Sequence, residues 1–414
     1  MWDKLFDLFL TQLFRSGDLT VTYPDGTIKS YGDGKNGRVG IELKDPTLPR
    51  KLVLTPELSV GEAYMDGTLV IENDDLEAFL NICVRNFSNI DDSWIRRPFN
   101  TTRMILKGLS QYNPMGRARR NVAHHYDLSG DLYDLFLDKD RQYSCAYFEH
   151  PGMTLDDAQN AKKHHIAKKL LIQPGMRILD IGCGWGGLGL TLAKDFGANV
   201  LGVTLSEEQH KVAVASASDA GLADRARFEM IDYRKVEGTF DRIVSVGMFE
   251  HVGTPHYDEY FRSVKKLLKE DGVALIHTIG HVGPPDTMNP WMEKYIFPGA
   301  YAPALSEITK AVDKHRLVTC DIEALRLHYS YTLNAWKDRT IANRSDIERL
   351  YDERFFRMWM FYLVAMEQSF NVGNLLVYQL QLGKALENVV PITRAYLHDE
   401  TRQDEGSRER TAAE

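Results

Sequence analysis

The sequence of 414 residues has few cysteines and no apolar run that approaches the length of a membrane span. A helix needs about 20 consecutive apolar residues to cross a bilayer. The four cysteines are scattered and form no C-x-x-C pair; they are Cys83, Cys145, Cys183 and Cys320. This usage fits a reducing compartment and argues against a disulfide framework or a zinc ribbon.

The chain also lacks an excess of positive charge and a recognisable leader. Its formal net charge of -8 argues against a dedicated nucleic-acid binder, which is normally basic overall. The first 14 residues are apolar but are interrupted by Asp3, Lys4 and Asp7, without a basic leader or a small-residue cleavage site. We therefore expect a cytoplasmic protein with no nucleic-acid partner. These features are also compatible with contact to the membrane surface.

Histidines occur in local pairs but without a third ligand at a familiar spacing. The pairs are His124 with His125, His164 with His165, and His277 with His281. Zinc sites in proteins normally take three or four side chains at characteristic spacings. The sequence therefore predicts no metal site.

With 43% hydrophobic residues the chain has enough apolar material for two or three domains. The pattern of residues 1–92 predicts a small α+β domain. Apolar residues from Trp2 to Leu13 recur at helical spacing, so this helix either packs on its own domain or lies on a bilayer. Alternation around Asp25-Gly26 predicts a β-hairpin. Residues 39–43 and 51–54 continue the strand pattern, and residues 61–80 look helical.

A basic segment, residues 93–120, follows this domain. It contains no acidic residue in a chain that is acidic overall; its basic residues are Arg96, Arg97, Arg103, Lys107, Arg117, Arg119 and Arg120. One interpretation is a solvated linker. The other is a patch for an anionic lipid surface, where each basic residue contributes on the order of 1 kcal/mol.

From residue 121 to about 394 helical and strand patterns alternate. Strands are predicted at 176–181, 200–204, 227–231, 241–246 and 272–277, and helices at 158–171, 188–196, 206–220 and 257–268. Such alternation predicts an α/β domain with a mostly parallel, doubly wound sheet that binds ligands at the carboxyl ends of its strands. Residues 395–414 are polar, and we expect a disordered tail.

The glycine turn Gly182-Cys183-Gly184-Trp185-Gly186-Gly187 follows the first strand of this domain. It matches G-x-G-x-x-G, but a dinucleotide site also needs an acid about 20 residues on. The next strand ends at Thr204 with no acid, whereas Asp180 stands just before the first glycine. Asp180 could cap a turn. Acid followed by Gly-x-Gly, however, resembles the Rossmann-like class I S-adenosylmethionine methyltransferases, in which residues such as Asp232 and Tyr233 after the third strand hold the adenine.

Further motifs narrow the resemblance. They are His125-Tyr126-Asp127-Leu128-Ser129-Gly130, Tyr143-Ser144-Cys145-Ala146-Tyr147-Phe148, Leu205-Ser206-Glu207-Glu208-Gln209, Phe249-Glu250-His251-Val252-Gly253, His277-Thr278-Ile279 and His328-Tyr329. In this order they resemble the cyclopropane-fatty-acid synthase and mycolic-acid methyltransferase family, over residues 121 to about 390. The small N-terminal domain and basic segment resemble the bacterial synthases that act on membrane phospholipids.

The resemblance implies two bound groups. S-adenosyl-L-methionine would be held by Tyr143, Ser144, Asp180, Gly182, Gly184, Thr204, Gln209, Asp232 and Tyr233. Bicarbonate, as the base, would be held by Cys145, Glu250, His277, Ile279 and Tyr329. Without the resemblance, we would interpret His277 as a core histidine and Cys145 as a nucleophile. A thiolate beside a sulfonium would risk self-methylation, so we interpret Cys145 as a positioning residue.

The implied reaction is methyl transfer to the double bond of an acyl chain, which leaves a carbocation until a proton is lost. Such a site should exclude water and offer aromatic faces to the cation. The candidates, each of which could also be ordinary core, are Tyr143, Tyr147, Phe148, Phe249, Trp291, Tyr295, Tyr301 and Tyr329. A largely apolar helix at 354–370 could line an acyl tunnel or lie in the core.

We therefore expect a cyclopropane-forming enzyme that modifies unsaturated acyl chains of membrane phospholipids. Its partner would be a phospholipid bilayer surface with anionic lipid, at the inner face of the cell membrane, and the bacterial synthases suggest a homodimer. Simple C-methylation to methyl-branched chains would share every motif. A non-catalytic lipid-binding protein and an NAD oxidoreductase are the remaining alternatives.

Overall fold

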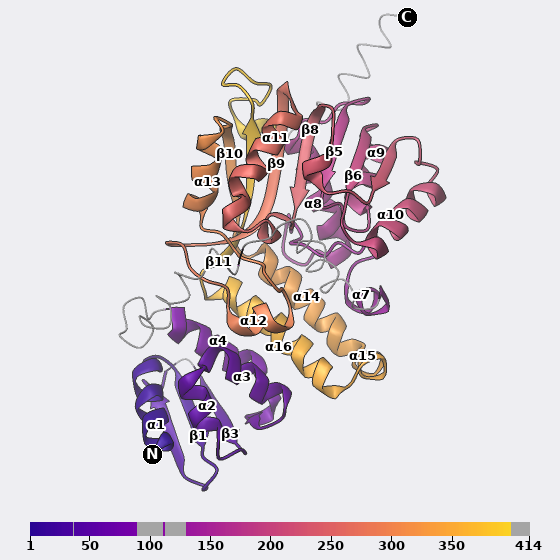
Figure 1. The fold of residues 1–414 in the computed structure, drawn as a ribbon. Coiled ribbons are helices and arrows are strands. Elements are labelled where there is room, and N and C mark those ends of the chain that lie inside the picture. Colours follow the sequence, from indigo (N-terminus) through magenta and orange to yellow (C-terminus); the bar gives the residue numbers. More distant parts are fainter. Residues whose placement is uncertain (36, 89–110, 112–129, 399–414) are drawn as a thin grey trace, which may run out of the picture.

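The computed structural model describes residues 1–35, 37–88, 111 and 130–398. A small N-terminal domain lies beside a larger α/β domain, with a layer of helices between them (Figure 1). Apart from residue 111, the predicted basic linker lies outside the described residues. So do residues 121–129, which include most of the His125 motif, and the predicted tail from residue 399 onward.

The N-terminal domain is a four-stranded sheet covered by helices. Its strands, in the order β2-β1-β3-β4, are β1 (Asp18–Thr22), β2 (Ile28–Gly32), β3 (Arg38–Leu43) and β4 (Leu69–Ile71). Its helices are α1 (Trp2–Leu13), α2 (Leu48–Leu54), α3 (Pro56–Met65), a 3₁₀ turn η1 (Glu72–Asp74) and α4 (Leu76–Ser88). The predicted hairpin is confirmed, since β1 and β2 pair antiparallel and Tyr23 donates to the carbonyl of Thr27 (2.8 Å).

Two predictions for this domain need correction. Residues 51–54 are not a strand but the end of α2, where Pro49 in the first turn has the fixed φ that a helix start favours. The helical pattern at 61–80 is interrupted by β4 and by η1, in which Asn73 has a positive φ of 58°. The amphipathic helix α1 packs on its own domain, because Phe6, Leu10 and Leu13 are buried in it.

The large domain contains a seven-stranded sheet in the order β10-β11-β9-β8-β5-β6-β7. The strands are β5 (Arg177–Ile181), β6 (Asn199–Val203), β7 (Ala226–Glu229), β8 (Phe240–Val246), β9 (Leu268–His281), β10 (Val318–Leu325) and β11 (Leu375–Gly383). The predicted parallel sheet is confirmed for β5 to β9. The structure adds β10 and β11, and β11 runs antiparallel to both of its neighbours.

Helices cover both faces of this sheet (Figure 1). They are α8 (Leu155–Lys169), α9 (Gly187–Asp195), α10 (Glu207–Asp219), α11 (Tyr257–Leu267) and α13 (Leu305–Lys314), with 3₁₀ turns η2 (Tyr233–Lys235), η3 (Phe249–His251), η4 (Thr254–His256) and η5 (Arg394–Leu397). Several begin at a side-chain cap. Thr154 accepts from the amide of Asp157 at the start of α8, and Ser206 from that of Gln209 at the start of α10.

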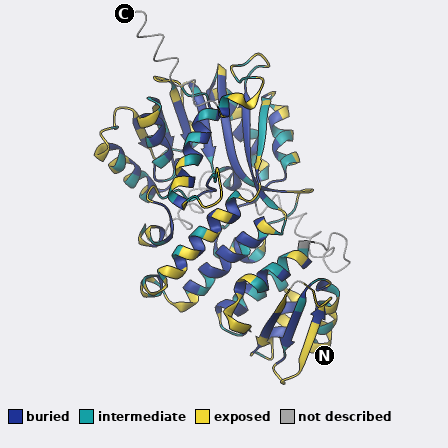
Figure 2. Cartoon of the chain, turned by 180° about the vertical axis from the view of Figure 1, so that it is seen from behind, coloured by how far each residue is buried: buried dark blue, intermediate teal, exposed yellow. Residues whose placement is uncertain are grey.

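A helical layer joins the sheet to the N-terminal domain. It consists of α7 (Gly130–Phe136), α12 (Pro290–Tyr295), α14 (His328–Ala342), α15 (Arg344–Leu350) and α16 (Glu353–Asn371). α16 packs against α14 on one side and against α3 and α4 on the other, so much of it is buried (Figure 2). Among the described helices none is both long and apolar enough to cross a membrane.

Candidate functional site

A cavity of about 150 Å³ opens at the carboxyl ends of the parallel strands. The predicted sheet places ligands there. All nine residues predicted for the cofactor line this cavity, namely Tyr143, Ser144, Asp180, Gly182, Gly184, Thr204, Gln209, Asp232 and Tyr233. The structure therefore brings together every residue of this group.

The glycine turn between β5 and α9 requires glycine for a steric reason. Gly182, Gly184 and Gly186 have φ angles of 80°, 55° and 89°, in the left-handed region that favours glycine. A Cβ on Gly182 would lie 2.8 Å from the Cβ of Met248. The turn therefore lets the backbone pass close to the end of β8, and the cavity stays open above it.

Asp180 is buried near the end of β5, beside this turn. Burial raises the pKa of its carboxyl to about 7, although Lys162 lowers it. Its Oδ2 has no hydrogen-bond partner among the described residues. A buried acceptor without a partner is costly, so a ligand that donates an N–H or O–H group there would relieve the cost.

The other cofactor candidates already have partners. The hydroxyl of Thr204 donates to Oε1 of Gln209 (3.0 Å) and accepts from the amide of Ser206 (3.2 Å). Arg234 donates to both carboxylate oxygens of Asp232 (2.8 and 2.6 Å). A ligand at Asp232 would therefore share that carboxylate with Arg234, a residue that the sequence did not indicate.

One short segment, residues 142–145, forms the wall between this cavity and a second one. Two buried side chains of α8 hold it. Gln159 donates to the carbonyl of Ser144 (2.9 Å), and Nζ of Lys162 donates to Oε1 of Gln142 (2.8 Å) and to the hydroxyl of Ser144 (2.8 Å). Burial lowers the pKa of Lys162 to about 8. Sequence reasoning missed both residues, which look like ordinary surface positions of a polar helix.

The second cavity has a volume of about 1310 Å³. It is lined by all five residues predicted for the bicarbonate site: Cys145, Glu250, His277, Ile279 and Tyr329. The two cavities share lining residues, namely Tyr143, Ser144, Gly247 and His251. The cofactor candidates and the proposed base site therefore face each other across one thin wall.

Glu250 belongs to η3, which follows β8. Its Oε1 accepts a hydrogen bond from the amide of Ile279 on β9 (2.6 Å), and its Oε2 has no partner among the described residues. Burial raises the pKa of this carboxyl to about 7. Glu250 can therefore exist in either protonation state near neutral pH, as acid–base chemistry requires.

His277 and Cys145 are both held in their neutral forms. Burial lowers the pKa of His277 well below its ordinary value, and its Nδ1 lies 3.2 Å from Nε2 of Gln379 on the neighbouring strand β11. Burial raises the pKa of the Cys145 thiol, which donates to the carbonyl of Ala146 (3.3 Å). A thiol with a raised pKa is a poor nucleophile, which favours the positioning interpretation of Cys145.

Aromatic side chains form part of the cavity wall. The hydroxyls of Tyr143 and Tyr362 are hydrogen-bonded (2.9 Å), and the Tyr329 ring packs on Phe370 (4.8 Å between centroids). Of the predicted aromatic candidates, those that line this cavity are Tyr143, Trp291, Tyr301 and Tyr329. The other four do not. Phe249, for example, stacks on Tyr257 in the core of the sheet.

Among the described residues, no group of three His, Cys, Asp or Glu side chains converges as a metal site would. The site consists of polar groups in a largely apolar wall. Among the residues predicted for the base site, Glu250, His277 and Tyr329 supply a carboxyl, an imidazole and a phenol that could move or hold a proton.

Solved structures with the same architecture include cyclopropane synthases. The cyclopropane synthase MmaA2 from Mycobacterium tuberculosis is 32% identical, with a TM-score of 0.61, and the match covers 66% of this chain and 99% of that one. The mycolic acid cyclopropane synthase CmaA1, complexed with S-adenosylhomocysteine and CTAB, is 33% identical with the same TM-score and coverage. The fold and the cofactor cavity are thus those of a class I S-adenosylmethionine-dependent methyltransferase.

The sequence comparisons narrow this class. The model of the family described as mycolic acid cyclopropane synthetase matches residues 114–380, and the chain belongs to that family. A second model, described only as a domain of unknown function, matches residues 5–91. The domain boundaries at residues 92, 120 and 394 stay predictions.

Curated relatives match most of the chain. The cyclopropane-fatty-acyl-phospholipid synthase of Escherichia coli is 36% identical over 356 residues, which cover 86% of this chain and 90% of the relative. The tuberculostearic acid methyltransferase UfaA1 of Mycobacterium tuberculosis is 34% identical over 380 residues, covering 88% and 87%. Both matches extend beyond the methyltransferase domain.

Proposed function

We propose that the protein transfers a methylene group from S-adenosylmethionine to the cis double bond of unsaturated acyl chains in membrane phospholipids, forming cyclopropane rings. The observation that carries this proposal is the cluster of Glu250, His277 and Tyr329 on the wall of a large apolar cavity next to the cofactor cavity. The 36% identity to a cyclopropane-fatty-acyl-phospholipid synthase supports it.

The cofactor would be held at Asp180, the glycine turn, Thr204, Gln209 and Asp232, and when bound it supplies an electrophilic methyl group. The unpartnered oxygen of Asp180 fits such a ligand, because the amino acid and ribose parts offer N–H and O–H donors. The protein then has to place an alkene against the methyl group and exclude water. Apolar walls with Tyr329 and Tyr143 suit both tasks.

Bicarbonate fits the proposed base site in part. A small oxyanion would meet three hydrogen-bonding groups there: the unpartnered Oε2 of Glu250, the imidazole of His277 and the hydroxyl of Tyr329. The amide of Ile279, however, already donates to Oε1 of Glu250. An anion at that amide would have to displace this oxygen, which is easier for a protonated carboxyl, and the raised Glu250 pKa favours that form.

Lipid analysis tests the reaction. Cells that express the protein should contain phospholipids whose unsaturated chains have gained the mass of one CH₂ and resist hydrogenation, as rings do. Purified, folded protein that binds S-adenosylhomocysteine but leaves unsaturated phospholipids unchanged would refute the proposal.

A second candidate is C-methylation of the same chains to methyl-branched products. The 34% identity to a tuberculostearic acid methyltransferase and to a probable fatty acid methyltransferase of Pseudomonas putida favours it. Both reactions pass through the same carbocation and differ in which carbon loses the proton. Gas chromatography of the isolated fatty acids separates ring from branch.

We also propose peripheral association with the inner face of the cell membrane, through the basic segment 93–120, and a homodimer. The run of basic residues without acidic ones supports an anionic lipid partner. Binding to vesicles that contain phosphatidylglycerol should weaken as salt rises, and sedimentation of the protein with vesicles measures it. Equal binding to neutral vesicles would contradict the proposed attraction to anionic lipid. Analytical ultracentrifugation measures the mass of the protein in solution and so tests the homodimer.

A further inference from the structure

The large cavity does not end in the catalytic domain. It continues between the two domains into the core of the N-terminal domain, where its lining comes from α1, α2, α4 and the sheet. We use the name N-terminal chamber for the part lined by Phe6, Leu10, Leu19, Ile41, Leu69 and Leu80. The whole cavity of about 1310 Å³ exceeds the roughly 300–1,000 Å³ of pockets for ligands of drug size.

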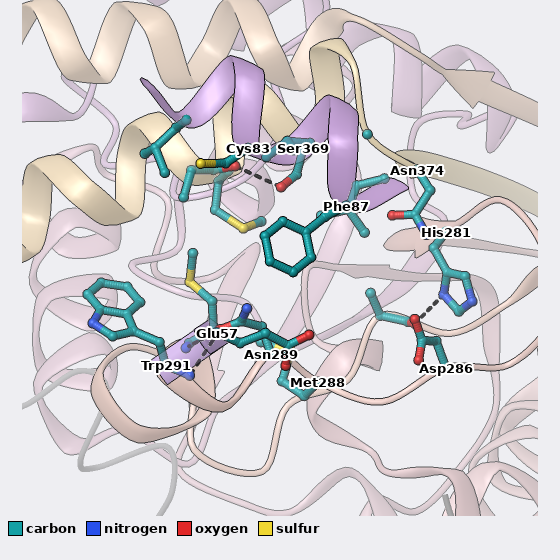
Figure 3. A pocket seen from close by; sticks show the side chains of 18 of the residues that line it. Glu57, Cys83, Phe87, His281, Asp286, Met288, Asn289, Trp291, Ser369 and Asn374 are labelled. Atoms are coloured by element: carbon teal, nitrogen blue, oxygen red, sulfur yellow. Dashed lines mark hydrogen bonds between the residues drawn. The ribbon is translucent and has the colours of Figure 1, made fainter. Parts of the chain in front are cut away.

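Helix α4 connects this chamber to the catalytic domain. Its lining residues, Phe79, Leu80, Cys83, Val84 and Phe87, recur at helical spacing and form one stripe along the helix. The stripe faces α16, which contributes Ala365, Met366 and Ser369 to the same cavity. Figure 3 shows the Phe87 ring in this cavity, with Cys83 and Ser369 close to each other at its edge. A continuous apolar path therefore leads from the N-terminal core to α16.

Few charged groups line the cavity. The carboxylates in its lining are Glu57, Glu250 and Asp286, and the segment from Val282 to Pro285, which also lines it, is exposed. Among the described lining residues there is no lysine or arginine. Cys83 is the one ionisable group on the α4 stripe, and burial raises the pKa of its thiol to about 12. The chamber thus suits hydrocarbon and excludes a polar head group.

We propose that the N-terminal chamber holds part of an acyl chain of the lipid substrate, so that the N-terminal domain selects chains by length. The inference rests on the proposed function and gives the N-terminal domain a part in it. Two observations carry it: one cavity joins the chamber to Glu250 and His277, and the residues that define the chamber are all apolar.

Two substitutions of opposite sign test the chamber. Cys83→Phe narrows the path along α4 into the chamber and should shift the products toward shorter chains, whereas Leu80→Ala enlarges the chamber and should favour longer ones. Each methylene excluded from the chamber should lower relative use of a chain about fourfold, the fold change that corresponds to about 0.8 kcal/mol. Product ratios from an equal mixture of phospholipids with one head group and different chain lengths measure the shift. A merely destabilised protein would not shift the ratio in opposite directions.

Controls distinguish the effect of side-chain volume on chain selection from a loss of folding. Cys320→Phe places the same ring at a partly exposed cysteine of β10 that does not line the cavity, and it should leave the ratio unchanged. Melting temperature and S-adenosylhomocysteine affinity of each full-length variant report folding. Unchanged ratios in both folded chamber variants would overturn the proposal.

Two substrate series identify the chain. Length is varied first in the unsaturated chain and then in the saturated partner chain of the same phospholipid. A shift in either series supports the chamber and tells which chain enters it.

Binding of a phospholipid with a fluorescent polyene chain, measured without cofactor, keeps the two proposals distinct. Protein that binds this probe with the expected size dependence but modifies no lipid would refute the proposed reaction and leave the chamber standing. Normal turnover with unaltered length preference and probe affinity in both variants would refute the chamber alone.

Discussion

Two buried carboxyl groups, Asp180 and Glu250, lie on either side of the wall formed by residues 142–145. Each has one oxygen without a partner among the described residues, and burial raises the pKa of each to about 7. Ordinary core acids are paired or hydrogen-bonded, because an isolated buried charge is costly. Perturbed pKa values of this kind cluster at functional sites. This supports the assignment of Asp180 to the cofactor site and of Glu250 to the base site.

Asp180→Asn should weaken cofactor binding and stabilise the ligand-free protein at alkaline pH. Folding raises the pKa of Asp180 from 3.8 to about 7, so the folded state holds its proton where the unfolded state has lost it. Stability therefore falls as pH rises from about 4 to 7. The amide removes this loss, of order 2–4 kcal/mol. Melting curves at pH 5 and 8 measure it. A gain that is equal at both values would contradict the titration.

The same variant should bind S-adenosylhomocysteine at least tenfold more weakly, because the unpartnered carboxylate oxygen that could accept from the ligand is replaced by part of a carboxamide, which accepts more weakly and adds an N–H donor. Isothermal titration calorimetry gives the affinity. Asp195→Asn, on the exposed end of α9, is the control and should leave it unchanged. Wild-type affinity in Asp180→Asn would remove Asp180 from the cofactor site.

Glu250→Gln should lower turnover by two or more orders of magnitude while cofactor affinity stays within about twofold. The amide can still accept from Ile279 but cannot take up or release a proton. Single-turnover product formation and calorimetry measure the two quantities. Loss of cofactor binding would show that Glu250 belongs to the cofactor side of the wall. Glu270→Gln changes an exposed carboxylate that pairs with Lys384 and lines neither cavity, and it serves as the control.

At the scale of single residues, the sequence predicted the side chains that line both cavities. It did not predict the side chains that hold those lining residues in place. Asp180 lies near the end of β5, Glu250 follows β8 and His277 lies within β9. Each belongs to a motif in a fixed order, so chain order was enough to group them. Gln159, Lys162 and Gln379 act through side-chain contacts to other elements, 15, 18 and 102 residues away along the chain, which no local pattern reveals. Their residue types carry no signal, because glutamine and lysine are usually solvated.

At the scale of elements, α8 does more than cover the sheet. Its buried Gln159 and Lys162 fix the backbone and side chains of residues 142–145, which are shared by both cavities. A charged group buried in this way is tolerated when it is well hydrogen-bonded. The helix therefore holds in place the segment that separates the two cavities.

Lys162→Met should reduce both cofactor affinity and turnover, since Ser144 and Gln142 lose their shared donor. A tenfold or greater loss of affinity is expected, with a folded far-UV circular dichroism spectrum. Lys168→Met is the matched control, because Lys168 lies on the same helix but donates only to the carbonyl of Leu397 among the bonds described for it (3.3 Å). If both variants behave alike, α8 does not position the wall.

Secondary structure could be predicted where the hydrophobic period was long and regular. The strands β5 to β9 and the helices between them follow the expected alternation closely. The strand predicted at 51–54 was wrong because its three apolar residues, Leu52 to Leu54, fit a strand and a helix equally, and Pro49 favours the helix. Strands β10 and β11 were not predicted, and pairing at the sheet edge, a tertiary effect, determines them.

At the scale of the whole molecule, polar contacts fasten the N-terminal domain to the helical layer. Lys337 of α14 donates to Glu77 of α4 (2.7 Å) and to the buried Glu367 of α16 (2.9 Å). Asn81 of α4 donates to Gln368 of α16 (2.6 Å). These contacts hold α4 against α14 and α16, and α4 and α16 both line the large cavity.

Lys337→Met should destabilise the protein by about 3–5 kcal/mol, because Glu367 would remain buried without its cation. Lys294→Met removes another contact between the domains, the exposed pair with Glu62, and should cost less than about 1 kcal/mol. Urea denaturation measures both. Equal losses would show that burial of Glu367 does not determine the cost.

The wall shared by both cavities has a thermodynamic consequence. Tyr143 and Ser144 contact whatever occupies either side, so each ligand alters the surface that the other meets. Linkage then requires reciprocity: if a bound acyl chain changes cofactor affinity by some factor, bound cofactor changes acyl-chain affinity by the same factor. A positive coupling would give an ordered cycle, in which the spent cofactor leaves more readily once the modified chain has withdrawn into the bilayer.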